Sequence, residues 1–203
     1  MKPVAWLLPI LVAGCASGPP PRVSLGDAWP SEPSGWSSAR EHWTRRASQT
    51  TEFLKIVDVA ATLESPGWRA AYVRERARRL HLPADEEARL AEAQKQAAAE
   101  TWEVEIVIAT GKNEWNDLRK GALSMWRVSL ASADGREVLP ISLVEDRRPR
   151  GELSGWFPDL EPFYQPYIAR FPKVTPDGKP LAAGSLTLKV TSAVGGVELT
   201  WAE

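Results

Sequence analysis

Apolar residues in the second half of the chain recur at every second position, which is the spacing of a β-strand with one buried face. The clearest case runs from Trp102 to Ile108, with Glu103 and Glu105 at the alternate positions. We expect these glutamates to face water and the apolar residues to face a core. The same alternation predicts further strands around Trp126, Val128 and Leu130, around Leu139, Ile141 and Leu143, around Leu186, Leu188 and Val190, and around Val197, Leu199 and Trp201.

Two further strands and two turns complete the expected sheets. Thr51–Leu63 is rich in β-branched and aromatic residues and is the predicted first strand, while Phe163–Phe171 is a strand bounded by prolines. The dipeptides Asp134-Gly135 and Gly195-Gly196 favour tight hairpin turns. Because the alternation is clean from strand to strand, the sequence predicts antiparallel sheets.

Between the first two strands the pattern changes to that of helices. Ser65-Pro66 is typical of a helix start, because serine caps free N–H groups and proline suits the first helical position. Pro83 begins a second helix, whose acidic first turn complements the helix dipole. We therefore expect a helical hairpin over residues 66–100, inserted between strands one and two.

These elements predict a mainly β domain over residues 46–203 with an α-helical insertion at 66–100. The favoured fold is an antiparallel β-sandwich, because about six or seven strands separated by turn signals are typical of one. A small open barrel is the alternative. The pattern resembles the broad immunoglobulin-like or transthyretin-like class, and we assign the domain to no narrower family.

The first residues carry the pattern of a secretory signal peptide over 1–14. Lys2 supplies a positive start, a short apolar run follows, and small residues precede Cys15. The tetrapeptide Val12-Ala13-Gly14-Cys15 resembles the lipobox of bacterial lipoproteins. That resemblance implies cleavage between Gly14 and Cys15 and anchoring to membrane lipid through acylated Cys15. An ordinary signal peptide with a chance cysteine is the alternative.

A segment rich in Gly, Pro and Ser follows at 15–45, and we expect a semi-extended tether there with a reach of roughly 60–90 Å. Trp29, Trp36 and Trp43 interrupt it, and we expect them to fasten it to the domain rather than to anchor a partner or glycan. In enteric lipoproteins the residue after the cysteine sorts the protein, and Ala16 favours the outer membrane. The expected location is therefore the cell envelope, facing the periplasm or the cell surface.

Composition and charge narrow the functional classes. The chain has 203 residues, a formal net charge of −1, one cysteine and two histidines. This near-neutral charge excludes a generally basic nucleic-acid-binding protein, and one cysteine excludes a disulfide framework or a thiolate zinc cluster. Motifs for a serine nucleophile, a zinc peptidase or a phosphate loop are absent, so we assign no catalytic residue, metal or cofactor.

Two polar groups are interpreted as solvated surface. Asn113, Glu114, Asn116 and Asp117 offer oxygen atoms without the spacing of an EF-hand, so we expect an Asx turn there. The first helix carries a basic group that could contact anionic headgroups or polysaccharide but is expected to be a solvated face: Arg69, Arg74, Arg76, Arg78 and Arg79.

The loop over 146–162 is the expected partner-binding region, because loops carry function and Arg with Trp is typical of interface hot spots. The candidate residues are Arg147, Arg148, Trp156, Phe157 and, on the Asn/Glu loop, Trp115. We interpret the protein as a lipid-anchored, non-enzymatic interaction or structural module with an envelope protein as partner. A glycan- or peptidoglycan-binding lipoprotein and a carboxylate-based hydrolase are the alternatives.

Overall fold

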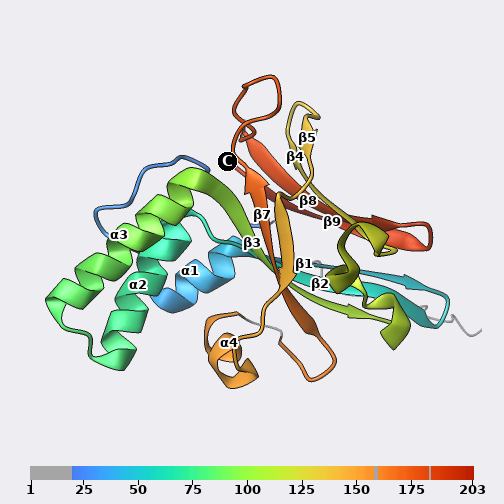
Figure 1. Ribbon diagram of the computed structural model, residues 1–203, viewed down its shortest axis with the longest axis horizontal. Coiled ribbons are helices and arrows are strands. Elements are labelled where there is room, and N and C mark those ends of the chain that lie inside the picture. Colours follow the sequence, from blue (N-terminus) through green and yellow to red (C-terminus); the bar gives the residue numbers. More distant parts are fainter. Residues whose placement is uncertain (1–19, 158–159, 183) are drawn as a thin grey trace, which may run out of the picture.

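Two antiparallel sheets and a group of helices make up the computed structural model, which describes residues 20–157, 160–182 and 184–203 (Figure 1). In spatial order, the first sheet contains β1 (Thr44–Thr51), β2 (Leu54–Leu63), β3 (Thr101–Thr110), β7 (Gln165–Pro172) and β6 (Ser142–Glu145). The second contains β5 (Glu137–Val138), β4 (Arg127–Ser132), β8 (Ser185–Ser192) and β9 (Gly195–Ala202). Neighbouring strands within this described part pair antiparallel, as the alternating pattern predicts.

The helices gather on one side of the first sheet, and the second sheet lies on its other side (Figure 1). Helix α1 (Trp36–Trp43) precedes β1, and the predicted helical segment corresponds to α2 (Pro66–Leu80) and α3 (Ala84–Glu100) between β2 and β3. Ser65 caps α2 as expected, since its hydroxyl accepts a hydrogen bond from the Trp68 N–H at 3.1 Å. His81 ends this helix in the left-handed conformation, with a φ of 50°.

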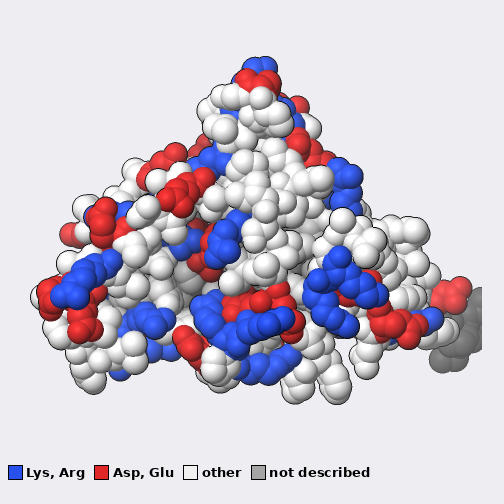
Figure 2. All heavy atoms as spheres, viewed as in Figure 1, with Lys and Arg blue, Asp and Glu red and all other residues white. Residues whose placement is uncertain are grey.

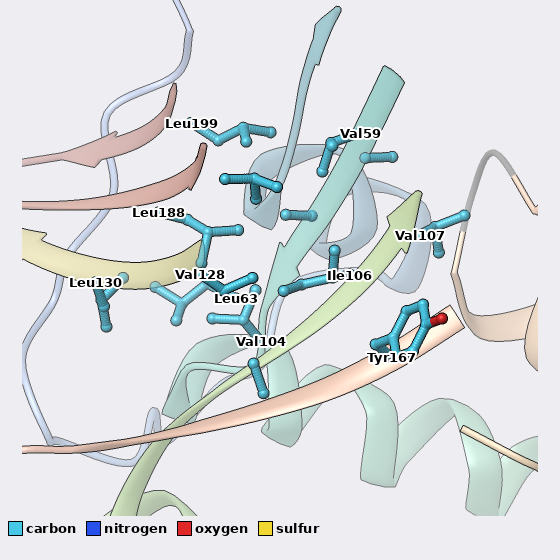
Figure 3. Packing of buried hydrophobic residues seen from close by; sticks show 14 of the residues in the cluster. Val59, Leu63, Val104, Ile106, Val107, Val128, Leu130, Tyr167, Leu188 and Leu199 are labelled. Atoms are coloured by element: carbon cyan, nitrogen blue, oxygen red, sulfur yellow. The ribbon is translucent and has the colours of Figure 1, made fainter. Parts of the chain in front are cut away.

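The main core lies between the two sheets (Figure 3). Leu63, Val104 and Ile106 from the first sheet are fully buried against side chains of the second. Their partners in Figure 3 include Val128, Leu130, Leu188 and Leu199. These residues occupy alternate positions on their strands, so the predicted inward face of each strand is confirmed.

The predicted first strand, Thr51–Leu63, belongs in the structure to two strands of a hairpin. Its second part is β2, whereas Thr51 ends β1, and Glu52 turns the chain between them with a φ of 52°. The hydrophobic pattern gives no signal for β1, because this edge strand carries mainly polar side chains and exposes several of them. The strand boundary in the prediction is therefore wrong.

The predicted tether over 15–45 is folded onto the domain throughout its described part, which begins at residue 20. Val23 and Leu25 are each only 4% exposed, and the Val23 N–H donates to the Ala202 carbonyl at 2.8 Å. Trp43 is buried at the end of α1, so the expectation that tryptophans fasten this segment to the domain is confirmed. The composition of this segment, rich in Gly, Pro and Ser, does not reveal that its isolated apolar residues Val23 and Leu25 are buried against the domain.

The chain through Leu139, Ile141 and Leu143, predicted as a single strand, changes sheets partway along its length. Leu139 and Ile141 lie in no strand: β5, which pairs with β4 across the predicted Asp134-Gly135 turn, ends at Val138, and only Leu143 falls in a strand, β6, which pairs with β7. Pro140 lies between β5 and β6 and has no N–H to donate to a ladder, so the chain leaves the second sheet there. Leu139 and Ile141 consequently remain 53% and 66% exposed.

An aromatic cluster holds the helices to one another, and it consists of Trp36, Trp68, Tyr72, Trp156 and Phe157. The Trp68 ring stacks on Tyr72 and on Phe157, with ring centroids 5.3 and 5.6 Å apart. Trp36 meets Trp68 and Trp156 edge to face. The cluster therefore joins α1, α2 and α4 (Arg150–Trp156) through one ring that is only 2% exposed.

Replacing Trp68 with alanine should lower the free energy of unfolding by about 3–5 kcal/mol, because the change leaves a cavity at the centre of the cluster. Urea unfolding followed by circular dichroism measures the loss. Leu80→Ala on the same helix is the matched control, because Leu80 is 56% exposed and its removal should cost less than about 0.5 kcal/mol. A loss of under about 1 kcal/mol for Trp68→Ala would show that the cluster does not hold the helices.

Candidate functional site

The predicted partner-binding residues do not share one exposed loop. Trp156 and Phe157 are only 6% and 1% exposed, because they lie in the aromatic cluster and α4 occupies much of the predicted loop. The Arg79 guanidinium lies 4.6 Å from the centre of the Trp156 ring, which further encloses it. Arg147 is exposed, whereas Arg148 is partly buried. Large aromatic rings beside an apolar surface pack against it. Trp156 and Phe157 are therefore part of the core rather than available to a partner.

Trp115 is also partly buried and packs against the core. It ends the short helix η1 (Asn113–Trp115), its carbonyl accepts a hydrogen bond from the Trp126 indole at 2.6 Å, and the Lys112 ammonium lies 4.9 Å from its ring centre. Asn116 and Asp117 are buried rather than solvated, and Asp117 accepts hydrogen bonds from the Ser124 hydroxyl and the Met125 N–H. In the described parts of the chain, no group of His, Cys, Asp or Glu could hold a metal ion.

Arg148 lies at the edge of a polar site that the sequence does not reveal. Its guanidinium bonds to Asp146, with Nε 2.8 Å from Oδ2, and lies 3.8 Å from Glu105. Beside it is a cavity of about 270 Å³ under α2, which we call the arginine–carboxylate pocket. Its charged and polar lining is formed by Glu64, Arg69, Gln94, Glu103, Arg148 and Arg170.

Neighbouring strands place the acids of this pocket. Glu103 of β3 is the register partner of Arg170 on β7, and the Arg170 Nε donates to Glu103 Oε2 at 2.6 Å. Glu105 lies two residues along β3 and points to the same face of the sheet. We expected both glutamates to face water, but Glu105 is only 1% exposed. The expectation is wrong for Glu105, because β3 is buried on both faces at this point.

Arg69 is the central cation of the pocket. Its Nε donates to the Glu64 carbonyl at 2.9 Å, and its Nη1 donates to the Gln94 side chain at 2.5 Å. Its Nη2 lies 3.1 Å from a Glu64 carboxylate oxygen and 3.7 Å from one of Glu103. Arg69 therefore joins α2 to α3 and to both neighbouring strands while only 3% exposed. The prediction of a solvated arginine face is wrong for this residue.

Arg76, Arg78 and Arg79 each bond to another residue of α2. Arg78 and Arg79 both pair with Glu75, at 2.8 and 2.7 Å, on the outer part of the helix. Arg76 donates to the Tyr72 hydroxyl at 2.5 Å. Arg74 is exposed, as predicted for a solvated face.

Burial changes the protonation of two acids in this region. It raises the pKa of Glu64 to about 7, with Arg69 acting in the opposite direction. Burial and the neighbouring Asp146 carboxylate raise the pKa of Glu105 well above its usual value. Arg69, Arg148 and Arg170 line the pocket together with the carboxyl groups of Glu64 and Glu103, so its wall carries groups of both signs of charge.

This arrangement favours binding over acid–base hydrolysis. Glycoside hydrolysis needs two carboxyl groups that flank the substrate with space between them. Glu64 and Glu103 instead both pair with the Arg69 guanidinium, at 3.1 and 3.7 Å. The hydrolase alternative therefore gains no support from the acids that the fold brings together here.

A second surface feature is apolar. A groove of about 540 Å³ separates the segment Gly121–Val128 from the chain that crosses between sheets at Leu139–Leu143. Leu139 and Ile141 line it, and Leu123 on the adjacent helix η2 (Leu118–Leu123) is 85% exposed. In Figure 2 the surface in front of β6 is largely uncharged, and charged side chains gather to either side.

Neither the arginine–carboxylate pocket nor the apolar groove could be predicted from the sequence, for physical reasons. Glu103 and Glu105 look like ordinary outward-facing residues, and only a helix packed over them changes that reading. A weak signal existed in Arg69, which lies beside Trp68 and three residues before Tyr72 on what becomes the buried face of α2. Comparison of the chain with models of protein families, with curated proteins and with solved structures gives no match.

The raised pKa of Glu64 predicts that the free energy of unfolding falls as pH rises from about 4.5 to 7. Over this window folded Glu64 keeps a proton that the unfolded chain has released, so rising pH favours unfolding. The loss from this group is at most about 3 kcal/mol, and it is complete above pH 7. Acids whose pKa is lowered in the folded protein, such as Glu75, change the free energy of unfolding only at pH values below this window.

Urea unfolding at several pH values across this window measures the slope. Glu64→Gln should remove the part due to Glu64, whereas Glu114→Gln, at an exposed position, should leave the slope unchanged. Equal slopes for the wild type and Glu64→Gln would contradict the assignment.

Proposed function

We propose that the protein is a lipid-anchored, non-enzymatic component of the bacterial cell envelope that binds a partner protein. The lipobox-like Val12-Ala13-Gly14-Cys15 supports the anchor, and both Cys15 and the predicted signal peptide lie outside the described residues. No helix in the described part of the chain is long and apolar enough to cross a bilayer. Acylation of Cys15 would supply the attachment, and two or more acyl chains make it stable.

The way the chain enters the domain bears on where an anchored protein would sit. The Arg45 guanidinium donates to the Pro21 carbonyl at 2.8 Å, so the chain is held by the domain from this point onward. Residues 16–20 separate Pro21 from Cys15, and extended chain spans at most about 3.5 Å per residue, so the anchor reaches about 20 Å. An anchored domain would lie close to the bilayer surface rather than at the end of a long tether.

The apolar groove is the observation that carries partner binding. Exposed large apolar residues that cluster beside a concave surface are typical of interaction sites, and Leu123, Leu139 and Ile141 form such a cluster here. β5 pairs with β4 only at Leu130 and Ala131, so within the described chain the first half of β4 borders the groove as a sheet edge. An extended apolar segment of the partner fits such an edge, since its backbone can join the sheet.

The glycan-binding alternative has less support. Sugar recognition by stacking needs an open aromatic face, but Trp36 and Trp156 contact each other and Tyr72 within the aromatic cluster. Trp29 is partly buried and has the Lys95 ammonium 5.6 Å from its ring centre. These contacts favour a protein partner at the apolar groove.

We further propose that the two sheets form a sandwich of the broad immunoglobulin-like or transthyretin-like class, with α2 and α3 as an insertion. One edge supports closure of the sandwich, because the Gly196 N–H donates to the Gln49 side chain at 2.5 Å and links β9 to β1. At the opposite edge the chain crosses between the sheets and leaves the apolar groove.

Mass spectrometry of the protein extracted from its native membrane should find a chain that begins at Cys15 and carries diacylglycerol with or without an amide-linked acyl chain. Cys15→Ala should lose the lipid mass and move the protein to the soluble fraction. An unmodified Cys15 thiol, or residue 1 still attached in the mature protein, would contradict the anchor.

A photo-crosslinking residue in place of Leu139 should capture one envelope protein in living cells. Adding Ile141→Asp should lower the crosslink yield at least tenfold, because a charge in the groove opposes an apolar segment. Leu80→Asp is the control, since Leu80 is exposed on α2 and should have no effect. Equal yields with and without Ile141→Asp would remove the groove from the proposal.

A further inference from the structure

We propose that the arginine–carboxylate pocket binds a small zwitterion of the amino-acid type. The ligand carboxylate would bind the arginines, and its ammonium group would bind Glu64 and Glu103. This inference is independent of the membrane anchor and of the apolar groove, because it rests on the lining of a different cavity.

Two buried donors in the pocket wall have no acceptor among the described residues, and a bound ligand could supply one. Arg69 Nη2 and the Trp68 indole N–H are buried and have no hydrogen-bond partner among the described residues. Arg69 Nη2 is within ion-pair distance of Glu64, but not in hydrogen-bonding geometry. Buried donors in folded proteins are nearly always paired, and leaving one unpaired costs about 1–3 kcal/mol. Two unpaired donors in one cavity wall point to a ligand that supplies acceptor atoms.

The position of the arginines fits a carboxylate. Arg148 and Arg170 have side chains 34% and 39% exposed, so they lie where an entering ligand would meet them, whereas Arg69 is deep in the pocket at 3%. A guanidinium group matches a carboxylate with two parallel hydrogen bonds. A ligand carboxylate can therefore satisfy Arg69 Nη2 while it contacts the more exposed arginines.

The acids of the pocket exclude a ligand that carries only negative charge. Glu64 and Glu103 line the same cavity, and an anion alone would meet their repulsion. A cation alone would meet three arginines. A ligand with one group of each sign places each charge beside its opposite, which is the arrangement that electrostatic complementarity favours.

The size of the pocket limits the ligand. At about 270 Å³ it lies just below the usual range of roughly 300–1,000 Å³ for small-molecule sites. Gln94 adds an amide that can donate or accept, and Ile168 supplies an apolar wall. A free amino acid, or the charged terminus of a very short peptide, matches this size and lining.

Isothermal titration calorimetry on the detergent-solubilised mature protein tests the proposal. The probes are glycine, L-alanine, L-serine and L-glutamate, with acetate and ethylammonium as the separate halves of a zwitterion. We expect at least one amino acid to bind at least tenfold more tightly than either half. No binding of any amino acid at about 10 mM, or binding of acetate as tight as that of the best amino acid, would overturn the proposal.

Variants locate the binding. Arg170→Gln and Glu64→Gln should each weaken it at least tenfold, while Arg74→Gln, at an exposed position on α2, should leave it unchanged. Circular dichroism melting of each variant shows whether it is folded, and because the two pocket variants change opposite charges, either folded one suffices. Unchanged affinity in a folded pocket variant would show that the ligand binds elsewhere and would overturn the assignment.

Discussion

The packing of Trp68 beneath α2 is the contact on which the rest of the structure depends. This ring stacks on Tyr72 of its own helix and on Phe157 just after α4, and it meets Trp36 of α1 edge to face. Three helices that are distant in sequence are thereby held to one another. Residues of α2 and α3 line the arginine–carboxylate pocket beside Glu103 of β3, and Glu105 on the same strand is buried.

Burying these charges opposes folding. Moving ionised groups out of water is expensive, and a buried ion network contributes less to stability than apolar packing of the same volume. The packing of the aromatic cluster offsets this cost, and the raised pKa of Glu105 reduces it because the buried carboxyl group is less readily ionised. Buried donors without an acceptor add to this cost, and they are the atoms that the proposed ligand would pair.

The sequence predicts the elements of this protein better than it predicts their environment. Alternation identified β3, β4, β8 and β9, and the Ser65-Pro66 start identified α2, because these signals are local. β1 was missed, since an edge strand of polar residues has no such alternation. The burial of Glu105 and Arg69 depends on which helix covers which sheet face, and this is set by contacts between residues far apart in the chain. The burial of Trp156 and Phe157 could not be predicted for the same reason, because it depends on the helices that pack against them.

The central claim is that the helix layer turns an outward-facing strand surface into a buried, partly protonated polar site. Carbon-13 NMR of the glutamate side-chain carboxyl groups tests it directly, by following each resonance as the pH is changed. The expected result is that Glu64 titrates with a midpoint of about 7 and that the midpoint of Glu105 lies well above the ordinary glutamate value. If both carboxyl groups titrated near the ordinary glutamate value of 4.5, this face would be open to water and the account would be contradicted.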